Sequence, residues 1–318
     1  MKIILTGAGG FVGGHLLRRL LDDGFTVTAA VRNDAAKIDS RAEAVMIDGV
    51  SHAQDWSEVL APEAVVIHAA ARAHVMNDNA GDPLSRYREV NTAGTLSLAR
   101  QAAAAGVKRF VFVSSIKVNG ESTTAIPAFT EADQASSVDP YAISKIEAEE
   151  GLQLIAKKTS MEIVIIRPPL VYGPRVKANF LNLMRLASTA APLPFGAINN
   201  KRSMIYVANF VDFIVHCTEH PAAANQTFLI SDGRDLSLRD LLTQLRLAMG
   251  TAARLIPVPM FFFSLAGKIL GKQALADRLV GDLQVDPSKA NKLLAWTPPY
   301  TVEVGIQATV DEFLKSDK

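Results

Sequence analysis

The first 168 residues alternate short runs of β-branched residues with longer amphipathic segments. Six runs have the length and composition of buried strands: residues 2–6, 26–31, 44–47, 64–68, 109–114 and 162–167. The helical patterns between them include residues 11–22, 83–105 and 141–158. Strands that alternate with helices form parallel sheets, because each helix carries the chain back to the same edge. We therefore predict an α/β fold with a doubly wound parallel sheet.

The chain changes texture after Arg167, where proline and glycine punctuate short helical patterns. Helices are expected at residues 178–187, 208–218, 237–249, 287–294 and 303–314. A chain of 318 residues also exceeds the usual size of one hydrophobic core. We expect two domains, 1–168 and 169–318, with 206–220 as a segment that could return to the first domain.

Charge and composition exclude several classes of partner. The 33 basic and 32 acidic residues nearly cancel, so no broad charge favours nucleic acid. Cys217 is the only cysteine, and the chain opens on a strand pattern rather than a signal peptide, so a cytoplasmic protein is expected. The apolar stretch 259–270 contains Lys268 and is shorter than the roughly 20 residues that span a bilayer. No transmembrane segment is therefore predicted.

The sequence TGAGGFVG places Gly7, Gly10 and Gly13 between the first strand and the first helix, which opens with Phe11 and Val12. Glycines there permit a tight turn and let the backbone approach a diphosphate, while the helix N-terminus offers free N–H groups. A purely structural turn is the alternative. In this context the motif predicts a Rossmann domain that binds a dinucleotide, and the less regular region after residue 168 is expected to form a smaller C-terminal α/β lobe.

A second set of residues carries acid–base chemistry. Tyr141 and Lys145 stand four apart at the start of a predicted helix, so they share one face. A nearby ammonium favours the phenolate and would make a tyrosine a usable proton carrier at neutral pH. Ser114 and Ser115 leave the end of the strand 109–114, the edge where ligands bind in such sheets. We predict Ser115, Tyr141 and Lys145 as the catalytic residues.

The glycine loop, SSIKVNG, YAISK and RPPLVYGP occur in an order that resembles extended short-chain dehydrogenases/reductases of the nucleotide-sugar epimerase/dehydratase family. The resemblance covers nearly the whole chain. It is strongest to a bacterial subgroup that contains UDP-N-acetylhexosamine 4-epimerases and 4-keto-reductases of the quinovosamine type. Asn119 and Leu170 replace a tyrosine and an asparagine that are usual in the family, so its substrate contacts do not transfer directly.

The resemblance implies an NAD(P) cofactor. Family members that select NAD have an acidic residue after the second strand, where this chain has Arg32, a residue able to pair with a 2′-phosphate. NADP(H) is therefore expected, with NAD(H) possible and a solvated Arg32 as the alternative. The predicted cofactor contacts are Gly7, Gly10, Phe11, Val12, Gly13, Arg32, Asp48, Gly49, Ala69, Ala70, Ala71, Asn91, Ser114, Tyr141, Lys145 and Pro168.

The resemblance also implies a UDP-sugar as substrate. Arg202 matches a family arginine that pairs with phosphate, and Asn179 with Phe180 matches a pair beside the pyrophosphate and uracil. The full set of predicted substrate contacts is His74, Ser115, Lys117, Tyr141, Asn179, Phe180, Arg202 and Arg278. A homodimer through the helices around 83–105 and 141–158 is expected, and a partner nucleic acid is not.

The motif that starts at Ser115 narrows the reaction. Related 4,6-dehydratases have Thr-Asp-Glu where this chain has Ser115-Ile116-Lys117, so the acids that expel water are missing. The leading hypothesis is reduction at carbon 4 of a UDP-4-keto-6-deoxy-N-acetylhexosamine. The alternatives are a UDP-glucose or UDP-N-acetylglucosamine 4-epimerase with tightly bound NAD, an epimerase of a lipid-linked sugar, and a non-catalytic dinucleotide sensor.

Overall fold

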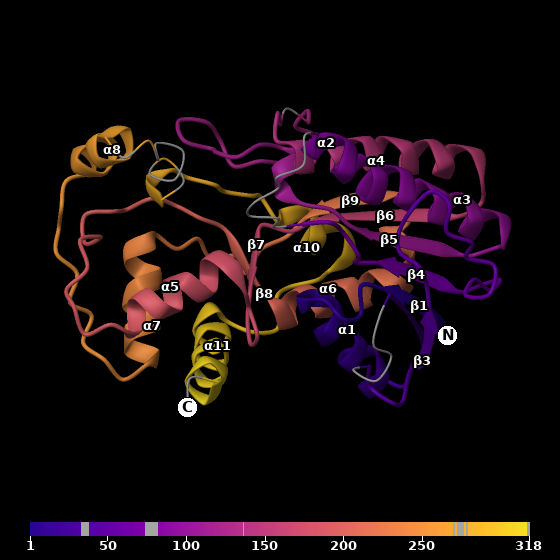
Figure 1. Ribbon diagram of the computed structural model, residues 1–318, viewed down its shortest axis with the longest axis horizontal. Coiled ribbons are helices and arrows are strands. Elements are labelled where there is room, and N and C mark those ends of the chain that lie inside the picture. Colours follow the sequence, from indigo (N-terminus) through magenta and orange to yellow (C-terminus); the bar gives the residue numbers. More distant parts are fainter. Residues whose placement is uncertain are drawn as a thin grey trace.

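A computed structural model describes residues 1–32, 38–73, 82–135, 137–269, 271, 277 and 279–316. Within these residues the centre of the molecule is a seven-stranded parallel sheet in the order β3-β2-β1-β4-β5-β6-β9 (Figure 1). Its strands are β1 (Lys2–Thr6), β2 (Thr26–Val31), β3 (Glu43–Met46), β4 (Val65–His68), β5 (Arg109–Val113), β6 (Glu162–Arg167) and β9 (Gln226–Leu229). The order reverses between β1 and β4, which is the predicted doubly wound arrangement.

Alternating residues of each strand supply the two faces of the sheet. Ile3 and Leu5 belong to one core cluster with Leu16 of α1 (Phe11–Asp22), whereas Ile4 belongs to the other with Leu98. This division follows from the two-residue repeat of a strand, and it explains why buried strands read as continuous apolar runs.

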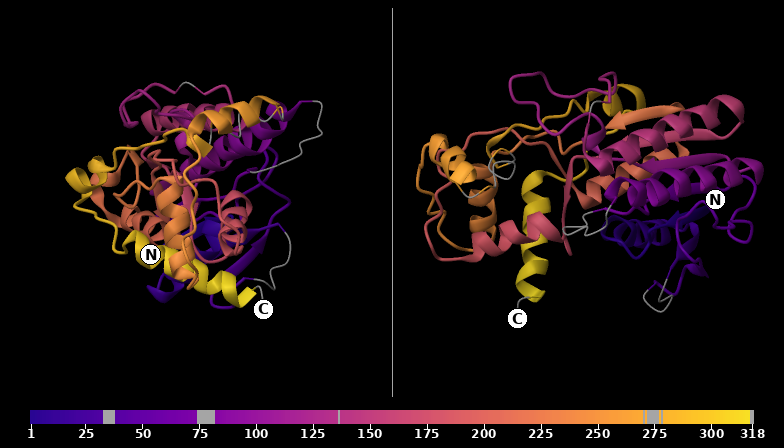
Figure 2. Two further views of the ribbon diagram at one scale, coloured as in Figure 1. Left: turned by 90° about the vertical axis from the view of Figure 1, so that its left-hand side faces the viewer. Right: turned by 45° about the horizontal axis from the view of Figure 1, so that its top comes forward.

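Helices cover both faces of the sheet (Figures 1 and 2). α1 and α6 (Val207–Glu219) lie on one side, while α3 (Thr95–Ala104) and α4 (Pro140–Lys158) lie on the other. The single predicted helix at 83–105 consists of α2 (Pro83–Tyr87), a π-helical turn η2 (Arg88–Gly94) and α3. Such π turns are rare and concentrate at functional sites. No local pattern in the sequence indicates one here.

The C-terminal lobe lies beyond the carboxyl ends of the strands (Figure 1). It contains the paired strands β7 (Leu170–Tyr172) and β8 (Met204–Tyr206) and several helices. These are α5 (Ala178–Ser188), α7 (Leu238–Ala248), α8 (Met260–Ile269) and α11 (Val302–Ser316). α10 (Ser288–Leu294) instead packs beside the sheet, against β9 and the short 3-10 turn η4 (Pro221–Ala223), and a second 3-10 turn, η3 (Ile116–Val118), follows β5. No helix in the described part of the chain is long and apolar enough to cross a bilayer.

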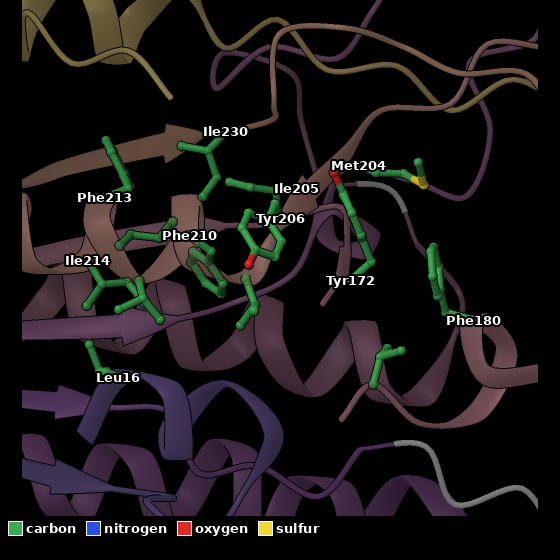
Figure 3. Packing of buried hydrophobic residues seen from close by; sticks show 14 of the residues in the cluster. Leu16, Tyr172, Phe180, Met204, Ile205, Tyr206, Phe210, Phe213, Ile214 and Ile230 are labelled. Carbon is green, nitrogen blue, oxygen red and sulfur yellow. The ribbon is translucent and has the colours of Figure 1, made fainter. Parts of the chain in front are cut away.

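One core cluster continues from the sheet into the lobe. Figure 3 shows Leu16 of α1 near Phe210 and Ile214 of α6, with Tyr172 and Phe180 of the lobe farther along the same cluster. α6 also joins α1 through an ion pair between Arg19 and Asp212, at 3.0 Å. This packing favours the assignment of 206–220 to the first domain, and β9 extends the sheet beyond the predicted boundary at 168.

Candidate active site

The glycine loop (residues 7–13) has no room for side chains at two of its glycines. A Cβ on Gly7, whose φ is +80°, would lie 2.7 Å from the backbone nitrogen of Ala70. A Cβ on Gly13 would lie 2.0 Å from the carbonyl oxygen of Gly7. The N-terminus of α1 is capped by Gly10 with no side-chain hydrogen bond, so the amides of its first turn remain for a ligand. These features fit the diphosphate of a dinucleotide.

His68 is a neutral side chain whose hydrogen bonds support the glycine loop. Its Nδ1 lies 2.7 Å from Oγ1 of Thr6, and its Nε2 lies 2.9 Å from Oγ1 of Thr95. Thr6 Oγ1 also accepts a hydrogen bond from the amide of Ala70 at 3.3 Å. Burial, aided by the positive charge of Lys145, lowers the pKa of His68 to about 3. The three side chains therefore tie β1, β4 and α3 together beneath the glycine turn.

The buried His68 predicts an acid-sensitive fold. Its folded pKa is below the unfolded value of 6.5, so the stability that it supports is present above pH 6.5 and is lost as pH falls toward 3. The loss is at most about 1.4 kcal/mol per pH unit. Between pH 7.5 and 5.5 we expect urea denaturation to show a loss about 1 kcal/mol larger in the wild type than in His68→Gln. Equal losses in the two proteins would refute this role.

The predicted catalytic residues meet at the carboxyl end of β5. Asp139 caps α4 by accepting a hydrogen bond from the amide of Ala142 at 3.0 Å, which fixes the first turn that carries Tyr141. The phenol of Tyr141 is hydrogen bonded to the side chain of Ser115. The structure thus brings the phenol and the strand-end hydroxyl into direct contact.

Lys145 lies one helical turn further and is only 1% exposed. Its Nζ donates a hydrogen bond to the carbonyl oxygen of Val113 at 2.9 Å and lies 4.4 Å from the ring centroid of Phe112. The ammonium is therefore held beside the same strand end as Ser115. Burial lowers the pKa of Lys145 to about 7, and the carboxylate of Glu149 opposes that shift.

The electrostatics of Tyr141 correct one expectation. The sequence predicted that Lys145 would lower the pKa of this phenol, yet burial raises it to about 12. The hydrogen bond from Ser115 acts in the lowering direction, while the charge of Asp139 raises the pKa further. The reason is that a buried phenolate loses its hydration, and the Lys145 ammonium is bound to Val113. In the free protein Tyr141 is a phenol that can donate a proton.

Lys117 lies on the other side of Tyr141. Its Nζ is 6.0 Å from the centroid of the Tyr141 ring and donates a hydrogen bond to Asp139 at 3.0 Å. Glu121 lies 3.4 Å from the same ammonium. The predicted substrate contact Lys117 is therefore next to the Tyr141 ring, with its charge balanced by two carboxylates.

The predicted contacts for the adenosine end of the cofactor lie at the ends of β2 and β3. Arg32 and Asp48 are exposed, and Cδ of Arg32 is 3.7 Å from the position that a Cβ on Gly49 would occupy. Ala69 and Ala70 run directly against Gly7. Of these predicted contacts, Ala69 and Ala70 border the glycine loop.

Asn91 and Ser114 are buried, and their side chains form hydrogen bonds with other residues of the protein. The side chain of Asn91 accepts a hydrogen bond from the amide of Arg72 at 2.8 Å and donates to Oγ of Ser144 at 3.1 Å. These hydrogen bonds steady the backbone beside α4. Ser114 donates its hydroxyl hydrogen to Glu149, and the carbonyl of the predicted contact Pro168 accepts from the amide of Ile116 at 3.0 Å. The Ser114 hydroxyl is thus committed to a protein partner.

The predicted substrate residues of the lobe that the structure describes, Asn179, Phe180 and Arg202, stand on other elements than β5 and α4. The ring of Phe180 is 1% exposed and stacks on Tyr172 at 5.4 Å (Figure 3), so its side chain serves the core, contrary to the expected ligand contact. Asn179 is exposed in the first turn of α5. Arg202 donates to the carbonyl of Gly281 at 3.2 Å. His74 and Arg278 lie outside the described residues.

Two residues of the site were missed by the sequence analysis. Glu149 and Arg167 form a buried ion pair behind Ser114, with 2.5 Å between Oε2 and a guanidinium nitrogen. The spacing of four residues between Lys145 and Glu149 was a usable signal, because it places both on one face of α4. Arg167 carried no such signal, since its partner is 18 residues away in a different element.

Known proteins resemble this chain along its whole length. The model of the NAD dependent epimerase/dehydratase family matches residues 3–231. A UDP-glucose 4-epimerase of Vibrio cholerae is 48% identical over 99% of this chain and 96% of its own length. An N-acetyl-alpha-D-glucosaminyl-diphospho-ditrans,octacis-undecaprenol 4-epimerase of Escherichia coli O157:H7 is 28% identical over 100% of this chain and 97% of its own.

The fold is shared with solved structures. The UDP-glucuronic acid 4-epimerase of Bacillus cereus in complex with NAD has a TM-score of 0.79 and 22% identity, with full coverage of both chains. The family is defined by NAD, so the preference for NADP(H) that Arg32 suggested has no support among these relatives. Family membership also establishes that the protein is an enzyme. The chain belongs to the NAD dependent epimerase/dehydratase family.

Proposed function

We propose that the protein is a UDP-sugar 4-epimerase that retains NAD. The observation that carries this proposal is the hydrogen bond between Tyr141 and Ser115 at the end of β5, with the Lys145 ammonium beside the same strand end. The glycine loop stands at the same edge of the sheet, because all of these strands are parallel. The 48% identical relative is itself a UDP-glucose 4-epimerase.

The residues divide the chemistry at carbon 4 between them. Bound NAD supplies the hydride acceptor and donor. Ser115 would orient the hydroxyl of carbon 4. Tyr141 would first lose its own proton to solvent, a loss that the positive charges of Lys145 and of bound NAD favour, and its phenolate oxygen would then take up the proton of that hydroxyl as the carbonyl forms. When the hydride returns to the opposite face, the same phenol gives the proton back, so no net oxidant or reductant is consumed. Lys145 holds the nicotinamide ribose and offsets the negative charge on Tyr141 during the transfer.

Contacts in the lobe are proposed for the UDP moiety. Asn179 and Arg202 remain candidates for the diphosphate, together with Arg278, and His74 remains a candidate for the sugar pocket; His74 and Arg278 lie outside the described residues. Lys117 is proposed to face the sugar, because it lies beside the Tyr141 ring. A homodimer through the segment 83–105, which contains α2, η2 and α3, and through α4 is likewise a proposal.

Reduction of a UDP-4-keto-6-deoxy-N-acetylhexosamine is the second candidate. It is favoured by Arg32, which is exposed at the end of β2, where an acidic residue would select against a 2′-phosphate. A reductase performs only the half of the cycle that delivers hydride and proton to a carbonyl, so the same three residues suffice. Its distinguishing feature is the stoichiometric consumption of NADPH.

Substrate conversion separates the two candidates. We expect purified protein without added cofactor to convert UDP-glucose or UDP-N-acetylglucosamine into its 4-epimer, as resolved by anion-exchange chromatography. Denaturation of the same preparation is expected to release NAD. Absence of conversion, together with oxidation of added NADPH by a UDP-4-keto-6-deoxy sugar, would overturn the epimerase in favour of the reductase.

A further inference from the structure

Three hydrogen bonds attach α4 to the end of β5. Residues at successive four-residue steps of α4 each bond one of three consecutive residues of the strand end: Tyr141 with Ser115, Lys145 with Val113, and Glu149 with Ser114. Residues four apart lie on one face of a helix, so the three hydrogen bonds come from one face of α4. The first two hydrogen bonds are formed by the proposed catalytic residues Tyr141 and Lys145. The third is formed by Glu149, which is not one of them.

The hydrogen bond between Glu149 and Ser114 is held in place by Arg167 of β6. Nε of Arg167 donates to both carboxylate oxygens of Glu149 at 3.1 Å, and a terminal nitrogen of the same guanidinium donates at 2.5 Å. The exposed fractions are 2% for Glu149 and 7% for Arg167. Such bidentate pairs combine charge with fixed geometry, which holds the carboxylate in one orientation.

Arg167 is fixed in turn by a residue in which this chain departs from the family pattern. Its Nη1 donates to Oδ1 of Asn119 at 3.0 Å, and the side-chain Nδ2 of Asn119 donates to the carbonyl of Thr130 at 2.9 Å. The family usually has a tyrosine at this position. A carboxamide can accept from the guanidinium and donate to the backbone at once, so Asn119 completes the chain of bonds behind Ser114.

We propose that Glu149, held by Arg167, is a positioning residue that sets the strand end carrying Ser115 and supplies the negative charge opposite the Lys145 ammonium. This inference rests on the proposed function of Ser115, Tyr141 and Lys145. Glu149 touches none of the reacting atoms, and it acts through Ser114 and through its charge. Removal of that charge also leaves the Arg167 guanidinium buried without its partner.

The charges around Lys145 show why the carboxylate matters. Glu149 acts on it from α4, His68 lies near it on β4, and Arg167 of β6 lies behind Glu149. His68 is neutral at physiological pH and Tyr141 is protonated. The Glu149 carboxylate is thus the group that keeps the ammonium charged against the cost of burial, which lowers its pKa to about 7.

The test is the affinity for NAD as a function of pH, measured by fluorescence titration without any sugar. Affinity in the wild type is expected to fall several-fold as pH rises through about 7, where Lys145 loses its proton. In Glu149→Gln the fall should begin about one pH unit lower, because the charge of Glu149 opposes the lowering of the Lys145 pKa and a nearby opposite charge shifts a pKa by about 1 to 3 units. Lys145→Met should show no such dependence.

Glu147→Gln is the matched control, because Glu147 lies on the same helix but pairs with Arg88 at the surface. Its pH profile should match that of the wild type. A purely structural role of Glu149 would lower affinity equally at every pH, and an unshifted midpoint in Glu149→Gln would overturn the proposal.

If this variant does not fold, the double variant Glu149→Gln Arg167→Gln removes both charges and should show the same shift; an unshifted midpoint there would also overturn it. Since no sugar is present, failure of the proposed epimerase activity would leave this result unchanged.

Discussion

Replacement of Tyr141 by phenylalanine is expected to lower kcat by about 10²–10⁴-fold while NAD remains bound. The phenol is hydrogen bonded to Ser115, and its raised pKa of about 12 keeps it protonated until a substrate and cofactor are in place. Phenylalanine fills the same buried space, so the loss isolates proton transfer from packing. Epimer formation and NAD content of the purified variant are the two measurements.

Ser115→Ala is the companion to this variant. It removes the hydroxyl that bonds the phenol but leaves the proton carrier, so a smaller loss is expected than for Tyr141→Phe. A Tyr141→Phe enzyme with wild-type kcat would show that another group exchanges the proton. A variant that had also lost NAD would show instead that the phenol serves binding.

Replacement of Gly13 by alanine is expected to abolish NAD binding and to lower the free energy of unfolding by about 3 kcal/mol or more. The added Cβ would lie 2.0 Å from the carbonyl oxygen of Gly7, so the turn must move. That movement displaces the amides that approach the diphosphate. Isothermal titration with NAD and urea denaturation measure the two effects.

Gly14→Ala is the matched control on the next residue of α1. Its Cβ would lie 3.5 Å from the carbonyl oxygen of Ala8, an ordinary contact. Alanine is also the better helix former by about 1 kcal/mol, so the control should bind NAD normally and be equally or more stable. If both variants behave alike, the glycine loop does not act through close backbone approach.

The sheet was predictable because its information is local. A buried parallel strand is an apolar, β-branched run, and the run at residues 162–167 coincides with β6. β9 was missed because it spans only Gln226–Leu229 in a region read as irregular, and its pairing with β6 is non-local. The π turn that contains Asn91 could not be predicted from the sequence either, because it depends on a non-local contact, the packing of η2 against α4.

The site was predictable only as far as its motifs reach. Tyr141, Lys145 and Ser115 were found by their order and spacing, and the structure brings them to one strand end. The sign of the pKa shift at Tyr141 was wrong, because burial outweighs a charge that is bound elsewhere. The ring of Phe180 was misplaced because the face of α5 that turns inward is set by packing against Tyr172.

The fate of the hydrogen on carbon 4 tests the central claim most directly. A UDP-sugar labelled with deuterium at carbon 4 would be incubated with the enzyme in ordinary water and followed by mass spectrometry. Transfer through a bound nicotinamide, with Tyr141 exchanging only the hydroxyl proton, predicts that both epimers keep the label. Loss of deuterium to solvent as the epimer forms would contradict the account.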